Sequence, residues 1–299
     1  MKLKTAIAEF LIAIEADGLA SSTIRWYRSL LSRFLSVVGN DRLTAIQTGG
    51  IRQFVILIRK DYREDTAAAH LRALHKFFKW CSDEYDIKNP MRNIRYPSVK
   101  KQHHPKPVAA DDIAKIFAAT EKQSAALGQR DRAIIALLAD SGIRAGELVS
   151  ILMVNIDMDR RRVVVTGKGD KSRVVPFSEF TARLIQKWMN QRGACPYLFY
   201  NMRTMDGLTV SGLQQIMKRL KKRAGVTGRV NPHAFRHAFA RDYLKNGGDL
   251  VTLRRILGHA DLEVTANFYA VFTHDEMSDS HEKFTPIKNL NLDERNGGE

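Results

Sequence analysis

Apolar positions in the first hundred residues recur only at helical spacing. The first run covers residues 5–16 and ends before Gly18, and a second begins at Ser21 or Ser22. A third run follows Gly49 and Gly50, and a fourth extends over about 66–82. Because apolar residues every three or four positions line one face of a helix, this part of the chain is predicted to form a small four-helix bundle.

The polar side of this predicted bundle is basic. Its cations alternate with Trp26, Tyr27 and Trp80 and comprise Arg25, Arg28, Arg33, Arg72, Lys76 and Lys79. Interleaved cations and aromatic rings are typical of a surface that binds nucleic acid. They are equally typical of a solvated face over an aromatic core, and the pattern alone leaves both interpretations open.

The pattern changes after a stretch rich in proline and basic residues, from Asn89 to Pro107. Beyond it, helical runs are predicted from about 110, over 131–139, directly after Arg144, and over 180–191, 211–224, 233–245 and 250–257. Two valine-rich segments, 162–166 and 172–177, flank Gly167-Lys168-Gly169-Asp170, which predicts a β-hairpin with Lys168 at its tip.

We therefore expect a mainly α protein with a small β-sheet. An all-α helical bundle domain is predicted over residues 1–98 and a basic linker over 99–107. An α+β catalytic domain with a C-terminal tail is predicted over 108–299. A basic linker between two basic domains would let them close around one duplex.

The charge balance supports a polyanionic partner. The chain of 299 residues has 48 Lys and Arg against 32 Asp and Glu, a formal charge of +16. The excess is present in both predicted domains, as expected of a nucleic-acid-binding protein. An excess of this kind can also serve solubility alone.

The same sequence argues against several other classes. Cys81 and Cys195 are isolated, which favours a reducing cytosol and predicts no structural zinc. No apolar stretch approaches the roughly 20 residues of a membrane span, and the N-terminus does not resemble a signal peptide. We therefore expect an intracellular, cytoplasmic protein associated with the nucleoid, without a cofactor or a metal.

Six residues in the second predicted domain suggest a specific chemistry. Two arginines, a lysine and two histidines can neutralise and protonate a phosphodiester, and a tyrosine can attack it covalently. In chain order they are Arg144 in S-G-I-R-A-G-E-L, Lys168 in G-K-G-D-K, His233 and Arg236 in P-H-A-F-R-H, His259 in L-G-H-A-D-L, and Tyr269 in N-F-Y-A. The ordered set predicts metal-free strand transfer on DNA through a tyrosine nucleophile.

Local geometry adds detail to this prediction. Arg144 precedes a short helix and is expected beside the backbone N–H groups of its N-terminus, a natural oxyanion site. Glu147 is expected to hold Arg144 by a charged hydrogen bond or to complete a helix cap. His233 and Arg236 are spaced to share one helix face. A zinc site at His233 and His237 is disfavoured, because no third ligand is nearby in sequence.

The motifs S-G-I-R-x-x-E-L, G-K-G-x-K-x-R-x-V-P, P-H-x-F-R-H and L-G-H-A-D-L, followed by a tyrosine, resemble the tyrosine recombinase (phage integrase) family over nearly the whole chain. The two-domain layout is most similar to its Xer-type members. This resemblance implies site-specific recombination of DNA through a 3′-phosphotyrosyl intermediate and a Holliday junction. It also implies four protomers on two DNA sites, with a C-terminal tail that docks on a neighbour through side chains such as Phe284 and Ile287.

The resemblance also implies a role for each residue of the set. Arg144 and Arg236 would bind the nonbridging oxygens of the scissile phosphate, and His259 would hydrogen-bond it. Lys168 would protonate the leaving 5′ oxygen and His233 would assist proton transfer at Tyr269, the nucleophile. In Xer-type members the nucleophile usually lies one position earlier, where this chain has Phe268, so the register of this segment differs.

Three other functions are alternatives to site-specific recombination. A related protein that only binds DNA should have lost a catalytic residue, and the sequence retains all six. A type IB topoisomerase would share the chemistry but release relaxed circles rather than recombinants. A metal-dependent nuclease would need a carboxylate cluster, which the sequence does not suggest.

Overall fold

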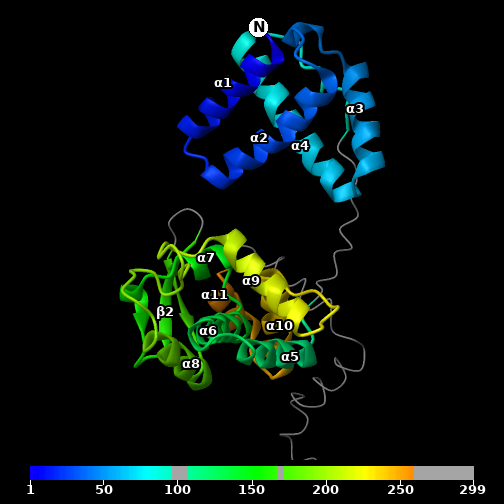
Figure 1. Ribbon diagram of the computed structural model, residues 1–299. Coiled ribbons are helices and arrows are strands. Elements are labelled where there is room, and N and C mark those ends of the chain that lie inside the picture. The colour runs from blue at the N-terminus through cyan, green and yellow to red at the C-terminus, as the bar shows by residue number, and fades with distance from the viewer. Residues whose placement is uncertain (96–106, 168–171, 259–299) are drawn as a thin grey trace, which may run out of the picture. The chain divides into compact units, whose positions relative to one another are not determined.

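The computed structural model describes residues 1–95, 107–167 and 172–258 (Figure 1). Their buried apolar side chains form one cluster in the N-terminal part and two in the C-terminal part. The chain divides into one unit over Met1–Gln102 and a second over His103–Glu299. Of the predicted linker, residues 99–107, only residue 107 belongs to the described part of the chain. The exact domain boundaries therefore stay a prediction.

The N-terminal unit is built from helices alone within its described part. The helices are α1 (Leu3–Ala16), α2 (Ser21–Val38), α3 (Thr48–Asp61) and α4 (Glu64–Tyr85), with a short 3-10 turn at Leu43–Ala45. Their apolar faces meet in an aromatic core in which Phe10, Phe34 and Phe77 are fully buried. The rings pack edge to face, with centroids 5.0 Å apart for Phe34 and Phe54. Aromatic pairs prefer this arrangement.

The predicted basic surface of this bundle is exposed. Six cations on α2 and α4 are exposed, and Trp26 beside them is 38% exposed. The cations are Arg25, Arg28, Arg33, Arg72, Lys76 and Lys79. Helix α3 starts earlier than expected, so Gly49 and Gly50 lie inside its first turn rather than before it. The helix tolerates them because the buried residues Ile51, Phe54 and Ile58 anchor the following turns.

The second unit combines a helical body with a three-stranded antiparallel sheet. Its helices are α5 (Ala110–Glu121), α6 (Ala125–Ser141), α7 (Ala145–Val149), α8 (Glu179–Met189), α9 (Val210–Arg223), α10 (Pro232–Lys245) and α11 (Leu250–Leu257). The sheet has the order β1 (Ile156–Asp157), β2 (Arg162–Thr166), β3 (Ser172–Pro176). The predicted fold class, mainly α with a small sheet and an all-α N-terminal bundle, is confirmed.

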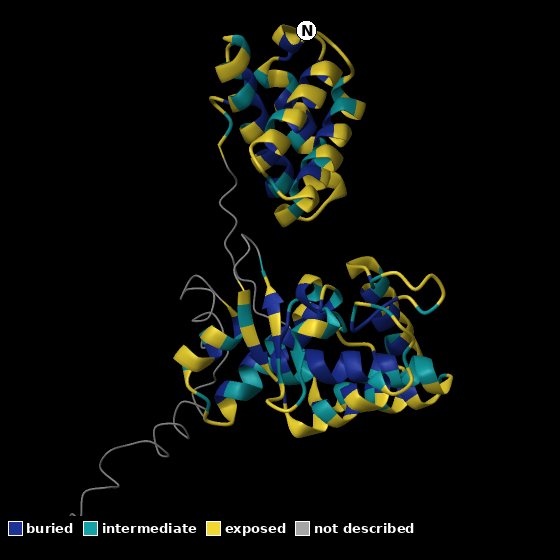
Figure 2. Cartoon of the chain, turned by 90° about the vertical axis from the view of Figure 1, so that its left-hand side faces the viewer, coloured by how far each residue is buried: buried dark blue, intermediate teal, exposed yellow. Residues whose placement is uncertain are grey.

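Helix α6 lies at the centre of the second unit. Its residues 133–138 are all buried (Figure 2). Helices α5, α8 and α10 pack around it, as an apolar helix needs cover on every side. The helix extends beyond the predicted 131–139 at both ends. The end of α6 leads directly into the turn that carries Arg144.

Strands β2 and β3 form the predicted hairpin. Val163 and Val165 on β2 are buried and pair with Val175 and Arg173 on β3. Side chains alternate between the two faces of a strand, so Arg173 occupies an inward-facing position beside valines. The tip, residues 168–171 with Lys168, lies outside the described residues. Strand β1 has only two residues, too few to be recognised from periodicity.

Candidate active site

Arg236 is the most deeply buried cation of the site. It lies on α10, which begins at Pro232 and is capped by Asn231, whose side chain accepts the N–H of Ala234 at 2.9 Å. Only 4% of Arg236 is exposed. Its guanidinium donates to the carbonyl oxygens of Gly142 at 2.7 Å and Leu257 at 2.8 Å. The side chain is therefore fixed between the turn after α6 and the end of α11.

The turn after α6 requires glycine at position 142. Its φ of +58° is in the left-handed region, which glycine adopts without steric cost. A Cβ atom there would lie 2.7 Å from Phe239 and 2.9 Å from Leu257. The tight turn brings Arg144, two residues later, to the start of α7 and to the mouth of the site.

Arg144 links α7 to the residue that follows α11. Its Nη1 donates to Oε1 of Glu147 at 2.9 Å, and its Nη2 donates to the carbonyl oxygen of Gly258 at 2.9 Å. The side chain is 42% exposed, so part of the guanidinium faces solvent. Of the two arginines predicted to bind one phosphate, Arg144 is thus the accessible one and Arg236 the buried one.

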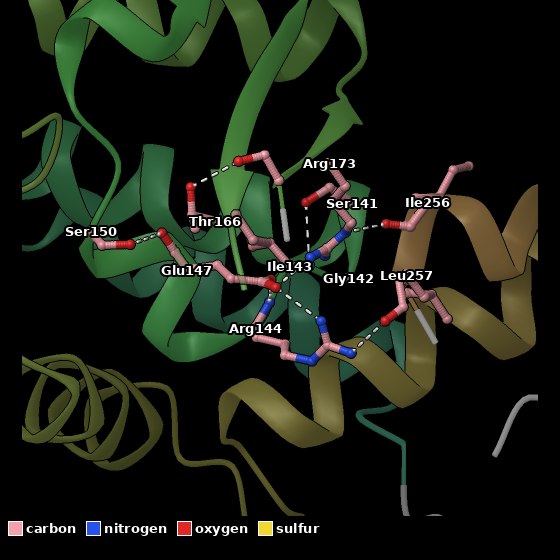
Figure 3. A network of polar contacts seen from close by, with 12 residues as sticks. Ser141, Gly142, Ile143, Arg144, Glu147, Ser150, Thr166, Arg173, Ile256 and Leu257 are labelled. Carbon is pink, nitrogen blue, oxygen red and sulfur yellow. Dashed lines mark hydrogen bonds and ion pairs between the residues drawn. The ribbon is translucent and has the colours of Figure 1, made fainter. Parts of the chain in front are cut away.

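Among the described residues, Glu147 is the one carboxylate that pairs with Arg144 and Arg173 in the cluster formed by Arg144, Arg173 and Arg236. It is 4% exposed, and its Oε1 accepts hydrogen bonds from both Arg144 and Arg173, while its Oε2 accepts the backbone N–H of Arg144 at 2.9 Å (Figure 3). Burial alone raises the pKa of Glu147, but the hydrogen bonds and charges of Arg173 and Arg144 outweigh it and hold that pKa below its ordinary value.

Glu147 contacts the start of α7, where backbone N–H groups beside Arg144 are predicted to form an anion site. It accepts the N–H of Arg144, so this one group is not free for an anion. Glu147 does both things that the sequence suggested, since it caps the helix and holds the guanidinium. The N–H groups of the residues that follow in α7, a helix of five residues, stay a predicted anion site.

Arg173 is a site residue that sequence reasoning missed. Its Nε donates to the carbonyl oxygen of Ile256 at 2.8 Å and its Nη1 pairs with Glu147 (Figure 3). Its side chain is 13% exposed. A signal was available, because a charged residue at an inward position of a valine-rich strand needs a buried partner.

The end of α11 gathers the three arginines. The carbonyl oxygens of Ile256, Leu257 and Gly258 accept hydrogen bonds from Arg173, Arg236 and Arg144 in that order. The last carbonyls of a helix have no partners inside the helix and carry its partial negative charge. The guanidinium groups satisfy them, and this fixes the three side chains relative to one another.

The cluster has more positive than negative charge. Three guanidinium groups surround one carboxylate, which leaves two positive charges in excess. Burial, together with the charges of Arg144 and Arg173, lowers the pKa of Arg236 to about 9, and Glu147 only partly opposes this. Bringing an anion to the cluster relieves this repulsion, so the site is suited to a phosphate group.

Of the other four predicted site residues, His233 lies in the described part of the chain and three lie outside it. His233 lies on α10 with Arg236 but is exposed, and its ring stacks on His237 with centroids 5.7 Å apart. Burial, then the charges of His233, Arg236 and Arg229, lowers the pKa of His237 to about 4. Lys168, His259 and Tyr269 lie outside the described residues, although His259 directly follows Gly258.

The described ranges 1–95, 107–167 and 172–258 contain no group of three His, Cys, Asp or Glu side chains placed to hold a metal ion. Within the same ranges no helix has the length and apolar composition needed to span a membrane.

Comparison with known proteins identifies the family of the chain. Residues 106–275 match the phage integrase family, and residues 7–84 match the phage integrase N-terminal SAM-like domain. The chain is 34% identical to tyrosine recombinase XerC of Erythrobacter litoralis, covering 91% of this chain and 88% of that protein. It is 28% identical to tyrosine recombinase XerD of Listeria innocua, covering 91% and 95%.

Solved structures share the fold. The Tn1549 transposon integrase in complex with a circular intermediate DNA superposes with a TM-score of 0.75 at 18% identity, covering 95% of this chain and 99% of that one. XerH site-specific recombinase bound to a palindromic difH substrate gives 0.70 at 21% identity, covering 89% and 80%. A two-part fold of this type with an arginine cluster defines a class of DNA strand transferases. The chain belongs to the phage integrase family, the tyrosine recombinases, and is an enzyme of site-specific recombination.

Proposed function

We propose that this chain cleaves and rejoins DNA strands with Tyr269 as nucleophile, at a phosphate held by Arg144 and Arg236. The observation that supports this most is the convergence of three guanidinium groups on the end of α11 with two positive charges in excess. A phosphodiester carries one negative charge, and the pentacoordinate transition state of its substitution carries two. The cluster therefore favours the transition state over the bound substrate.

The proposed reaction is two successive transesterifications. The phenolic oxygen of Tyr269 attacks phosphorus, the bond from phosphorus to the 5′ oxygen breaks, and a 3′-phosphotyrosyl bond forms. His233 assists removal of the phenol proton, His259 hydrogen-bonds the phosphate, and Lys168 gives a proton to the leaving 5′ oxygen. The released 5′-hydroxyl of a partner duplex then attacks the phosphotyrosine. Phosphodiester energy is retained, so the chemistry requires neither ATP nor another energy source.

Double-stranded DNA is the proposed partner. The exposed cations on α2 and α4 and the cationic site on the second unit both offer positive charge to phosphates, and relatives with the same fold are named as bound to DNA. We propose that linker 99–107 lets the two units engage one duplex. Four protomers would assemble on two sites, and the tail around Phe284 and Ile287 would dock on a neighbour.

A nicked suicide substrate tests this function. Because the short 5′ fragment diffuses away after cleavage, the covalent adduct accumulates and survives denaturing electrophoresis. We expect the adduct to form in EDTA, and a plasmid carrying two target sites to give recombinants. Relaxed circles without recombinants would instead favour a topoisomerase. Cleavage that EDTA abolishes would favour a metal-dependent nuclease, and binding without cleavage would contradict the enzyme assignment.

Lys168 is expected to be the acid for the leaving oxygen, because the hairpin of β2 and β3 can deliver its ammonium group to the DNA. Lys168→Ala should slow cleavage by about 10²-fold, as is typical of losing a general acid, with DNA affinity nearly unchanged. A substrate with sulfur at the bridging 5′ position should restore the rate, since a thiolate leaves without a proton. Lack of rescue would transfer the role to Lys171 or another donor.

A further inference from the structure

We infer that Arg173 is a positioning residue of the strand-cleavage reaction, which holds Glu147 and so leaves the guanidinium of Arg144 available to the scissile phosphate. This rests on the function proposed above. It concerns a residue outside the six to which the sequence analysis gave a role, although Arg173 is the arginine of the motif G-K-G-x-K-x-R-x-V-P. Four observations support it: the strand register, the shared carboxylate, an unpaired donor and the elements that Arg173 joins.

The strand register places a cation where an apolar side chain would be expected. Arg173 pairs across the hairpin with Val165, which is 3% exposed, and the next inward position of β3 is the buried Val175. Burying a guanidinium among valines is unfavourable unless charged hydrogen bonds compensate for lost hydration. Arg173 obtains them from Glu147 and from the carbonyl oxygen of Ile256.

The shared carboxylate connects Arg173 to Arg144. Oε1 of Glu147 accepts hydrogen bonds from both guanidinium groups. Without Arg173, the buried charge of Glu147 would be balanced by Arg144 alone, and the cluster would retain one excess positive charge instead of two. Arg144 would then be held more tightly by Glu147 and would be less able to neutralise a phosphate. Arg173 therefore acts on the reaction through Glu147 and Arg144.

One donor of Arg173 has no hydrogen-bond partner among the described residues. Its Nη2 is buried and makes no hydrogen bond to any of them. Buried donors are nearly always paired, so an unpaired one inside a charged cluster marks a network that is incomplete.

Arg173 also joins three of the elements that carry the proposed machinery. It lies on β3, whose hairpin bears Lys168; it binds Glu147 on α7, next to Arg144; and it binds the end of α11, which leads to His259. Gly258 makes room for it, since a Cβ atom at this position would lie 2.7 Å from Cδ of Arg173. One side chain thus sets the relative placement of three catalytic segments.

The test measures single-turnover cleavage of the suicide substrate by Arg173→Ala and Arg173→Lys. We expect the alanine variant to cleave about 10- to 100-fold more slowly with DNA affinity within about threefold of wild type. The lysine variant should recover much of the rate because it keeps the charge. Arg162→Ala is the matched control, since Arg162 lies on the adjacent strand and pairs with Asp157 at 3.1 Å, away from Glu147. It should cleave at the wild-type rate.

A methylphosphonate at the scissile position separates positioning from support of the fold. Its methyl group removes the negative charge that Arg144 neutralises, so it should reduce the penalties of Arg144→Ala and Arg173→Ala alike. The double variant should be little slower than Arg144→Ala alone, because both act through one group. Thermal unfolding of each variant shows whether it has a folding defect. If Arg173→Ala has one, the cleavage rate of Arg173→Lys is compared with that of the wild-type protein instead.

Three outcomes would overturn the inference: full-speed cleavage by Arg173→Ala, penalties that multiply in the double variant, or a slow Arg173→Ala that the methylphosphonate does not rescue. Failure of the proposed function is distinguishable, because then the wild-type protein itself would form no adduct on the ordinary substrate.

Discussion

Replacing Tyr269 with phenylalanine is expected to abolish the covalent protein–DNA adduct while leaving sequence-specific binding intact. The substitution removes only the phenolic oxygen, so the cationic cluster of Arg144, Arg173 and Arg236 is retained. Loss of an enzymatic nucleophile commonly lowers the rate by about 10⁴-fold or more, which places the adduct below detection. The measurement is denaturing electrophoresis of the suicide-substrate reaction, with DNA binding followed in parallel.

Tyr243→Phe is the matched control for this experiment. Tyr243 is a tyrosine on α10, the helix that carries Arg236, and burial followed by the charge of Asp249 raises the pKa of its phenol. A phenol that ionises less readily is a poorer nucleophile. Its ring also packs against Gly248, where a Cβ atom would lie 2.1 Å from it. We expect Tyr243→Phe to retain the adduct, and an adduct that persists in Tyr269→Phe would refute the assignment.

Arg236→Ala is expected to slow cleavage by about 10²- to 10³-fold, the usual cost of losing one preorganised donor to a developing oxyanion. Because Arg236 is buried and held by Gly142 and Leu257, its geometry is fixed before DNA arrives. The rate is measured under single-turnover conditions at saturating protein, so that a change in affinity does not contribute.

The same substitution tests the electrostatics of the cluster. It leaves two buried carbonyl oxygens without donors, which costs about 1–3 kcal/mol each, but it also removes repulsion with Arg144 and Arg173. The net loss of unfolding free energy should therefore be smaller than the sum of those costs. Arg241→Ala, on the same helix and paired with Asp242 at 2.7 Å, should change neither rate nor stability appreciably. A normal rate in Arg236→Ala would contradict a phosphate site at this position.

Sequence periodicity was sufficient for the main helices, for the hairpin strands β2 and β3 and for two members of the site, but not for the two-residue strand β1. The helical runs predict the bundle, and two valine-rich segments around Gly-Lys-Gly-Asp predict the hairpin, because local spacing reports which face of an element is buried. It also placed Arg144 in the turn after α6 and Arg236 on α10. The spacing of His233 and Arg236 puts them on one face of α10, yet His233 is exposed and Arg236 is buried. Burial depends on what packs against each turn of the helix, which the spacing does not reveal.

The rest of the site depends on contacts between distant positions. Arg144 meets the carbonyl oxygen of Gly258 across 114 residues, and Arg173 meets that of Ile256 across 83 residues. No local pattern encodes such pairs. Every residue has a backbone carbonyl, so the residue type does not show which carbonyl oxygen will accept a side-chain hydrogen bond. Arg173 belongs to the motif G-K-G-x-K-x-R-x-V-P and is a cation at an inward strand position, but neither signal identifies Glu147 as its partner.

Mapping the wild-type adduct shows whether Tyr269 is the nucleophile at the phosphate held by this arginine cluster. The adduct is digested with protease and nuclease, and the modified peptide is identified by mass spectrometry. We expect a nucleotide remnant attached through phosphate to Tyr269. A remnant on Tyr243, or on any residue other than Tyr269, would refute its role as the nucleophile.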